Sequence, residues 1–319
     1  MNETLLCVIG PTASGKTAVA LALAERLGGE IVSADARQVY RRLDIGTAKP
    51  TAGERGRARH HLLDVVDPDG EYHAGRFVRE AEDAIEEIRG RGRRPIVAGG
   101  TGLYVRALVR GLDVSVGRHP EVRAVLEARA EAEGLLSLHD ELRRVDPESA
   151  AVIHSNDRVR IIRALEVYRV SGETRSGQHR RGEGKVRRRH LLAALDPPRA
   201  ILYERIDDRF DTMMEEGFLD EVRRLLRAGY DPGLPCFRSP GYREMIAHLR
   251  GGLDLEEAVE RGKREHRRYA KRQPTWIRGE EEAVRFDPTG PGGVRAAAEA
   301  ILQALRGEEG RGPGTAEGS

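Results

Sequence analysis

The sequence contains very little cysteine, with only Cys7 and Cys236 among 319 residues. Two cysteines cannot form a disulfide framework, and Cys7 falls within an apolar run, so we expect a reduced, cytoplasmic protein. The sequence also shows no signal peptide and no apolar run long enough to span a membrane, and we expect no membrane partner. These absences argue against a disulfide-stapled secreted protein and against a membrane protein.

A strong charge of one sign is also missing. Lysine and arginine together number 54 and aspartate and glutamate 52, which leaves a net charge of only +2. The chain therefore has no global basic field, and any polyanion must be held by a local patch. Nearly all the basic residues are arginine, which suits phosphate contacts, although a GC-rich genome is the explanation we prefer. With 39% hydrophobic residues, the chain can form one large domain or two ordinary ones.

The most informative stretch follows the apolar residues 5–9 and reads Gly10-Pro11-Thr12-Ala13-Ser14-Gly15-Lys16-Thr17. The spacing G-x-x-x-x-G-K-T is typical of a phosphate-binding loop between a buried strand and a helix. Its glycines let the backbone curl around an anion, and the dipole of the following helix adds to the attraction. Lys16 supplies a mobile charge, and the Thr17 hydroxyl is placed to ligate Mg²⁺. A structural glycine-rich turn is the alternative, but the flanking strand and helix patterns favour phosphate binding.

Further strands are predicted at 30–35, 60–68, 95–102 and 190–196. We therefore predict an α/β fold, a P-loop type parallel sheet flanked by helices, with a helical insertion domain. Asp35 and Thr101 fall at the carboxyl ends of two strands, the edge of an open α/β sheet where ligands bind. An aspartate there can equally cap a helix or a turn, and its position alone does not decide between these roles.

Composition divides the chain into segments. The predicted α/β core comprises residues 1–118 and 187–307, the helical insertion residues 119–186, and a disordered Gly- and Glu-rich tail residues 308–319.

Within these segments, long helical stretches are expected at 120–144, 202–228 and 255–278, and Pro274 should kink or end the last of them. Residues 175–189 are strongly basic and contain glycines. Most charge runs form a solvated face, but here the basic residues cluster, and a nucleic-acid-facing patch is the other possibility.

A phosphate-binding loop identifies diphosphate chemistry and not a reaction. One candidate is a small-molecule or nucleoside kinase that uses ATP, and the other is a transferase that holds a different diphosphate. The sequence offers no obvious lid for a small substrate, and a large helical insertion with clustered arginine exceeds what such a substrate needs. The transferase is therefore favoured.

An ordered series of motifs between residues 5 and 278 resembles the bacterial tRNA dimethylallyltransferase family. The motifs are the P-loop, Ser33-Ala34-Asp35 with Gln38-Val39-Tyr40, residues 44–50, 60–64, 99–104, 156–157 and 163–168, Gly241-Tyr242-Arg243-Glu244, residues 269–273 and Thr275-Trp276-Ile277-Arg278. Each is weak alone, but their order is specific. The sequence departs from the family pattern at Ala36-Arg37, at Pro274 and over 177–189.

The resemblance implies an enzyme that transfers a dimethylallyl group from its diphosphate to N6 of the adenosine at tRNA position 37, next to the anticodon. It implies dimethylallyl diphosphate and the tRNA anticodon stem-loop as partners, Mg²⁺ as cofactor, and a protein that we expect to be a monomer. Asp35 would be the general base that takes the N6 proton. Thr101 would orient either Asp35 or the nucleobase, and Arg205 would bind the diphosphate.

The remaining site residues follow from the same resemblance. The diphosphate would lie on residues 10–17, with Thr17 at the metal. The residues expected to bind tRNA are Asp35, Ala36, Arg37, Gln38, Thr101, Arg123, Val159, Arg160, Ile161, Ile162 and Arg163.

Overall fold

A computed structural model describes residues 3–111, 117, 119–182 and 188–310. The chain divides into two compact units, one made of Met1–Val109 with Arg188–Ser319 and the other of Arg110–Arg187. Each unit has its own hydrophobic core.

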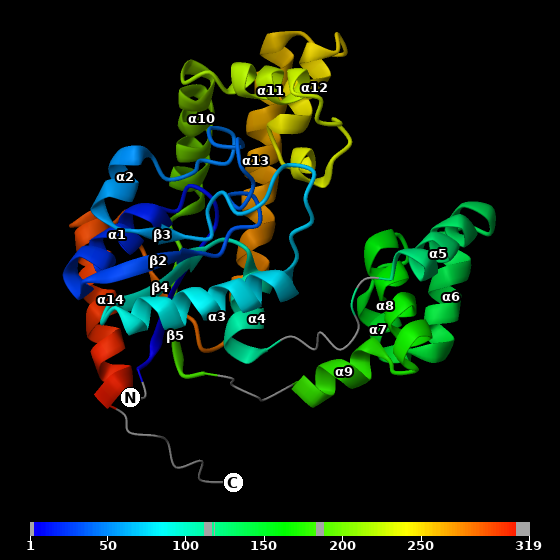
Figure 1. Cartoon of the computed structure of the whole chain (residues 1–319), viewed down its shortest axis with the longest axis horizontal. Coiled ribbons are helices and arrows are strands. Elements are labelled where there is room, and N and C mark those ends of the chain that lie inside the picture. The colour runs from blue at the N-terminus through cyan, green and yellow to red at the C-terminus, as the bar shows by residue number, and fades with distance from the viewer. Residues whose placement is uncertain (1–2, 112–116, 118, 183–187, 311–319) are drawn as a thin grey trace. The chain divides into compact units, whose positions relative to one another are not determined.

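The first unit is built on a parallel sheet, which has six strands within the described residues (Figure 1). The strand order is β3-β2-β4-β1-β5-β6, and each neighbouring pair is parallel. The strands are β1 Leu5–Ile9, β2 Gly29–Ser33, β3 His60–His61, β4 Arg94–Gly99, β5 His190–Leu195 and β6 Val284–Phe286. All five residues of β1 are buried, as expected for a central strand covered on both faces. The predicted α/β fold is confirmed.

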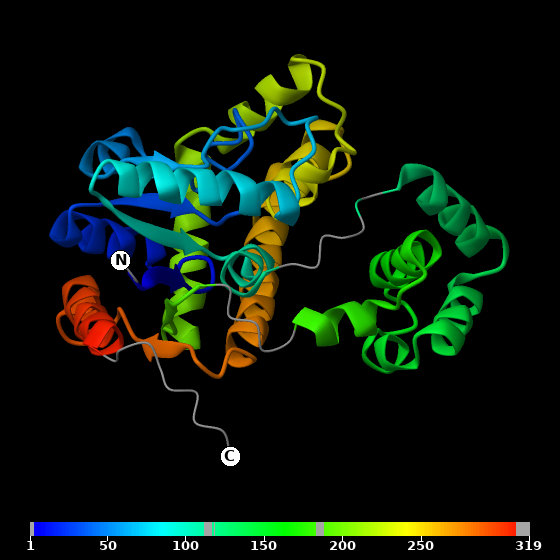
Figure 2. The same ribbon diagram turned by 60° about the horizontal axis from the view of Figure 1, so that its bottom comes forward.

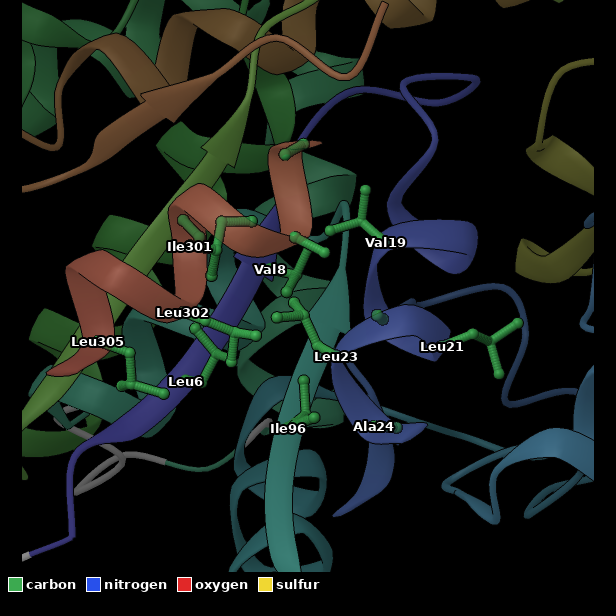
Figure 3. Packing of buried hydrophobic residues seen from close by; sticks show 14 of the residues in the cluster. Leu6, Val8, Val19, Leu21, Leu23, Ala24, Ile96, Ile301, Leu302 and Leu305 are labelled. Atoms are coloured by element: carbon green, nitrogen blue, oxygen red, sulfur yellow. The ribbon is translucent and has the colours of Figure 1, made fainter. Parts of the chain in front are cut away.

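One face of the sheet packs against α1 (Lys16–Leu27) and α14 (Gly293–Gly310). Side chains alternate along a strand, so Leu6 and Val8 of β1 point to this same face. They lie in one cluster with Leu23 of α1 and Ile301 of α14 (Figure 3). Burying each such side chain stabilises the fold by about 1.5–3 kcal/mol. This packing fixes the direction of α1, and therefore of the loop before it.

A group of helices continues the first unit beyond the sheet. It comprises α10 Arg199–Glu215, α11 Phe218–Arg227, η1 Pro235–Arg238, α12 Tyr242–Leu249 and α13 Leu255–Arg278; the remaining helices of the unit are α2 Ala52–Arg57, α3 Ala74–Gly90 and α4 Gly102–Arg110. Helices α10 and α13 pack side by side (Figure 2). Their core includes Val39, Tyr40 and Leu43 from the chain after β2, so these helices hold that segment in place.

The second unit is helical, as predicted for the insertion. It contains α5 Pro120–Ala132, α6 Leu135–Val145, α7 Pro147–Val152, α8 Arg158–Ser171 and α9 Arg175–Gly182. Its core joins α5, α6, α7 and α8 through apolar residues such as Leu126, Leu138 and Leu165.

Three of the predicted elements are wrong in extent. The strand expected at 60–68 ends at His61, because Leu62 and Asp64 have φ values of 62° and 56°, outside the extended region. The helix expected over 120–144 is two helices separated at Gly134. The helical region 202–228 is likewise two helices, α10 and α11, separated at Gly217.

Two predictions about helix ends also need correction. Helix α13 continues past Pro274 to Arg278, so the proline does not end it. The C-terminal helix α14 extends to Gly310, so residues 308–310 are helical and do not belong to a disordered tail. The rest of the predicted tail, residues 311–319, lies outside the described residues.

Candidate active site

The carboxyl ends of β1, β2 and β4 lie at one edge of the sheet, because the three strands are adjacent and parallel. Ile9, at the end of β1, is in register with Gly99 of β4, and Ser33 of β2 with Ala98. The P-loop, the segment that carries Asp35 and the turn that carries Thr101 therefore leave the sheet side by side. The predicted common edge for these three segments is confirmed.

The P-loop curls around the start of α1. Gly15 has φ 89°, a left-handed conformation that favours glycine, and it serves as the N-cap of the helix. Its carbonyl accepts the N–H of Val19 at 3.0 Å, and the Pro11 carbonyl accepts the N–H of Ser14 at 3.3 Å. The amino end of the helix and its unpaired N–H groups thus face the loop, as an anion site requires.

Lys16 lies inside this loop and is partly buried. Its Nζ donates to the Pro11 carbonyl at 2.6 Å. Burial lowers the pKa of Lys16 to about 8, although the nearby Asp35 carboxylate opposes the shift and Arg209 adds to it. The three charged groups therefore belong to one electrostatic environment at the sheet edge.

Asp35 has a capping role as well as a place at the sheet edge. Its Oδ1 accepts the backbone N–H of Arg37 at 2.8 Å and of Gln38 at 3.4 Å. Its Oδ2 makes no hydrogen bond with any other described residue. The turn-capping interpretation and the catalytic interpretation are thus compatible, because one oxygen fixes the carboxylate and the other can accept a proton.

Thr101 orients Asp35 indirectly, through the backbone. Its Oγ1 accepts the N–H of Ala36 at 2.9 Å, and its own N–H donates to the Ala34 carbonyl at 3.2 Å. The hydroxyl proton of Thr101 remains available as a donor. This geometry leaves Thr101 able to hold the Asp35 segment and to contact a substrate at the same time.

A pocket of about 290 Å³ opens beside the P-loop. Lys16 and Thr17 line one side of it and Arg209 of α10 lines another. Arg205 is not part of this lining, but it precedes Arg209 by one helical turn and the two guanidinium groups repel each other. Within the described residues, neither arginine makes a hydrogen bond or an ion pair. Glu54, which lines the same pocket, partly offsets the charge of Arg209 without forming an ion pair with it, and the two guanidinium groups still suit an anionic ligand.

Residues of the loop 44–51 also line the pocket. Lys49 lines the pocket, but its ammonium group binds the Tyr40 carbonyl and the carboxylates of Asp44 and Asp64, each at 2.6 Å, so it is a structural cation. Gln38 also supports this loop, because its Nε2 donates to the carbonyls of residues 47 and 48.

Glu221 of α11 supports the same loop from the other side. The buried carboxylate accepts the N–H groups of Asp44, Ile45 and Gly46 at 2.7–3.2 Å and the hydroxyl of Tyr242 at 2.6 Å. A carboxylate with four donors is stable without a cation. Glu221 therefore shapes one wall of the pocket.

Thr17 is the only residue expected at a metal, and its surroundings fit a weakly held Mg²⁺. It lines the pocket, and its hydroxyl has no hydrogen-bond partner among the described residues. No group of three or more His, Cys, Asp or Glu side chains suited to a metal occurs in the described part of the chain. A magnesium ion here would take most of its ligands from diphosphate oxygens and water.

The residues expected to bind tRNA in the insertion differ sharply in exposure. Val159 is 71% exposed and the Arg160 side chain 63% exposed. In contrast, Ile161 and Ile162 are fully buried in the core of this unit. Their side chains hold α8 in place, so any contact of these two residues with RNA would use the backbone, and the expectation that residues 159–163 bind tRNA stays a prediction.

Arg163 and Arg123 are held by a buried glutamate, Glu166. Arg163 donates to Glu166 at 2.8 Å and to the Gly117 carbonyl at 2.9 Å, and Arg123 lies 3.9 Å from the same carboxylate. Burial alone would raise the pKa of Glu166, but the hydrogen bonds from Arg163 and from the His119 N–H hold it below its usual value. The ionised Glu166 carboxylate therefore fixes the positions of both arginine side chains.

Sequence reasoning missed three residues of the site in the first unit: Arg209, Glu221 and Gln273. Arg209 follows Arg205 at helical spacing, which is a signal that the sequence contains. Glu221 and Gln273 act through backbone groups of distant segments, and no local pattern reveals such contacts. Gln273 accepts the N–H of Thr12, so this amide does not face the ligand side of the loop.

No helix among the described residues is long and apolar enough to cross a membrane.

Comparisons with known proteins identify the family. A family model described as IPP transferase matches residues 38–280. The chain is 52% identical over 300 residues to a tRNA dimethylallyltransferase of Anaeromyxobacter sp. (strain K), covering 94% of this chain and 97% of that protein. It is 49% identical over 289 residues to the enzyme of the same name from Halorhodospira halophila, covering 90% and 93% of the two chains.

Solved structures give the same result. The crystal structure of tRNA isopentenylpyrophosphate transferase from Bacillus halodurans matches with a TM-score of 0.71 and 38% identity, covering 97% of this chain and 98% of that one. A eukaryotic dimethylallyltransferase acting on tRNA matches with a TM-score of 0.83 and 27% identity, over 99% of this chain and 81% of the other. The chain therefore belongs to the IPP transferase family.

Proposed function

We propose that this protein transfers a dimethylallyl group from dimethylallyl diphosphate to N6 of the adenosine at tRNA position 37, and releases diphosphate. The single observation that carries the proposal is that the P-loop with Lys16 and the segment with Asp35 leave adjacent parallel strands at the same sheet edge. An anion and an attacking amine can meet there. The names of the relatives support the choice of donor and acceptor.

The diphosphate would lie on the P-loop, from Ala13 to Thr17. Backbone N–H groups at the start of α1, the Lys16 ammonium and the guanidinium groups of Arg205 and Arg209 would stabilise the charge that develops as the bond from carbon to diphosphate oxygen breaks. Thr17 would help to hold a Mg²⁺ ion, which when bound would neutralise part of the diphosphate charge.

On the side of the acceptor adenine, Asp35 would act as general base. The exocyclic amine of adenine is a weak nucleophile because its lone pair is delocalised, and it gains reactivity when a carboxylate takes its proton as the new N–C bond forms. Oδ1 of Asp35 is fixed by two backbone N–H groups, which leaves Oδ2 for this proton. Thr101 would keep the Asp35 segment in place and donate its hydroxyl proton to the base or its ribose.

The tRNA would be held by both units. The target base must leave its stack to reach Asp35. In the first unit, the backbone from Ala36 to Gln38 follows Asp35 and would contact the base, and the Arg37 guanidinium, which donates to the Pro235 carbonyl at 3.0 Å, would contact its neighbours. In the insertion, the exposed Val159 and Arg160, together with the anchored Arg123 and Arg163, would contact the RNA backbone.

We infer a cytoplasmic monomer that acts on the anticodon stem-loop. The P-loop alone would also suit an ATP-dependent kinase, but no relative described above is a kinase. The test is incubation of tRNA with the protein, Mg²⁺ and dimethylallyl diphosphate, followed by mass analysis of the nucleosides. Adenosine that is heavier by one dimethylallyl group at position 37 is the expected product. Phosphoryl transfer from labelled ATP without this product would refute the proposal, and loss of product with EDTA would support the metal.

A further inference from the structure

Gln273 joins the P-loop to the turn that carries Thr101. This side chain of α13 is only 7% exposed. Its Oε1 accepts the N–H of Thr12 at 2.8 Å, and its Nε2 donates to the Gly100 carbonyl at 3.3 Å. The two loops are thus bridged by one amide group, which reaches across 261 residues of sequence to Thr12.

The same helix crowds the turn at a second point. A Cβ atom on Gly100 would lie 2.7 Å from Nε2 of Gln273 and 3.8 Å from Nζ of Lys16. A Cβ atom on Gly102 would lie 2.2 Å from the ring of Trp276, one turn further along α13. Thr101 therefore lies between two glycines that α13 contacts directly. Only glycine allows so close an approach at these positions.

The amide of Gln273 is chemically matched to its two partners. The Thr12 N–H needs an acceptor and the Gly100 carbonyl needs a donor, and a glutamine side chain supplies one of each. A carboxylate could satisfy the first partner but not the second, and an apolar side chain could satisfy neither. A buried backbone group left without its partner is costly, so the loops would move to find new ones.

We propose that Gln273 is a positioning residue for the transfer reaction, which sets the separation between the diphosphate site and the Thr101 turn. The Thr101 hydroxyl accepts the Ala36 N–H, so the position of this turn also decides where Asp35 lies. Gln273 touches neither proposed reactant and acts through Thr12 and Gly100. The inference rests on the proposed function, because it assigns Gln273 a role in bringing the leaving group and the base to the correct distance.

The first test uses Q273M, which keeps the size of the side chain but removes both hydrogen bonds. We expect kcat to fall by about 10–100-fold, as misplacement of reacting groups predicts. The Kd for dimethylallyl diphosphate should rise by about tenfold or less, because the displaced P-loop presents its N–H groups to the diphosphate less well, a loss on the scale of one hydrogen bond. Thermal unfolding and circular dichroism check that the variant is folded. The exposed Gln303 of α14 provides the matched control, and Q303M should behave as wild type. A folded Q273M protein with wild-type kcat would overturn the inference.

The second test uses Q273E and compares its Kd for dimethylallyl diphosphate with that of the wild type between pH 5 and pH 8. When protonated, the introduced carboxyl group can both accept and donate, and at high pH it can only accept. The ratio of the two Kd values should therefore increase as pH rises, but the ionised carboxylate also repels diphosphate directly. The discriminating measurement is therefore kcat at saturating substrates over the same pH range: the kcat of Q273E relative to wild type should fall as pH rises, and a constant kcat ratio would overturn the inference. In contrast, a wild-type protein that does not bind dimethylallyl diphosphate at all would refute the proposed function.

Discussion

Replacing Lys16 with methionine should stabilise the free protein at pH 7 while it abolishes diphosphate binding. The pKa of Lys16 falls from its ordinary value of 10.5 to about 8 on folding, mainly because the ammonium loses water. Since a change of one in pKa corresponds to about 1.4 kcal/mol, the charged lysine costs the folded state at most about 3 kcal/mol at pH 7. Methionine has a similar shape and removes this cost.

The net gain should be smaller than this ceiling. Lys16 is only partly buried, so solvent screens part of the cost. The substitution also removes the hydrogen bond to the Pro11 carbonyl, which contributes about 1 kcal/mol. We therefore expect K16M to raise the free energy of unfolding by about 1 kcal/mol at pH 7.

The sign of the pH dependence follows from the direction of the shift. Because the pKa of Lys16 is lower in the folded protein, its cost is fully present below about pH 8. It decreases as pH rises from 8 to 10.5, where the unfolded chain also loses the proton. Urea unfolding without diphosphate at pH 7 and pH 10 measures the difference, with K271M at an exposed lysine as control. The reasoning is wrong if K16M is no more stable than the wild type at pH 7. It is also wrong if the difference in the free energy of unfolding between the two proteins is the same at pH 7 and pH 10.

Three further predictions concern the pocket and its walls. D35N should lower kcat by about 10²–10⁴-fold in a tRNA prenylation assay, with the affinity for dimethylallyl diphosphate retained, because the base is lost and the P-loop is not; wild-type turnover would exclude Asp35 as base. R209A should raise the KM for dimethylallyl diphosphate about 10–100-fold through the loss of a charge-assisted contact, without lowering the melting temperature; a stability loss with unchanged KM would contradict this role. E221Q should destabilise the protein by about 1–3 kcal/mol, because an amide presents an N–H where the carboxylate accepts; denaturant unfolding at wild-type stability would show that the loop of residues 44–51 does not depend on this acceptor.

Local signals predicted the sheet edge well. A strand followed by the P-loop pattern, and strands that end at Asp35 and Thr101, placed all three segments correctly, since parallel strands bring their carboxyl ends together. The glycines at 134 and 217 could have indicated the helix breaks, because glycine destabilises a helix interior. The prediction that Pro274 ends a helix failed for a different reason. Contacts of Gln273 and Trp276 hold α13 on both sides of the proline, so tertiary packing overrides the local preference of proline.

The supports of the site could not be predicted in the same way. Gln273 and Glu221 bind backbone groups that lie 261 and 175–177 residues away, and such contacts exist only once the fold brings the segments together. Which residues of the insertion are buried could be predicted more easily from the sequence. Along α8, Ile161 and Ile162 are followed by Leu165 at helical spacing, which predicts a core face, whereas Val159 and Arg160 lie off that face.

The charged groups beside the P-loop bear directly on how tightly a diphosphate would bind. Some arginines elsewhere are held by carboxylates; Arg129, for example, binds Glu133 and Glu141. Beside the P-loop, Arg205 and Arg209 have no ion pair within the described residues and repel each other, although Glu54 partly offsets the charge of Arg209, and burial lowers the pKa of Lys16. The protein therefore tolerates unfavourable electrostatics where an anion is to bind. A diphosphate would remove this cost, so part of its affinity would come from relieving a strain that the free protein already carries, and a neutral ligand of the same size would gain none of it.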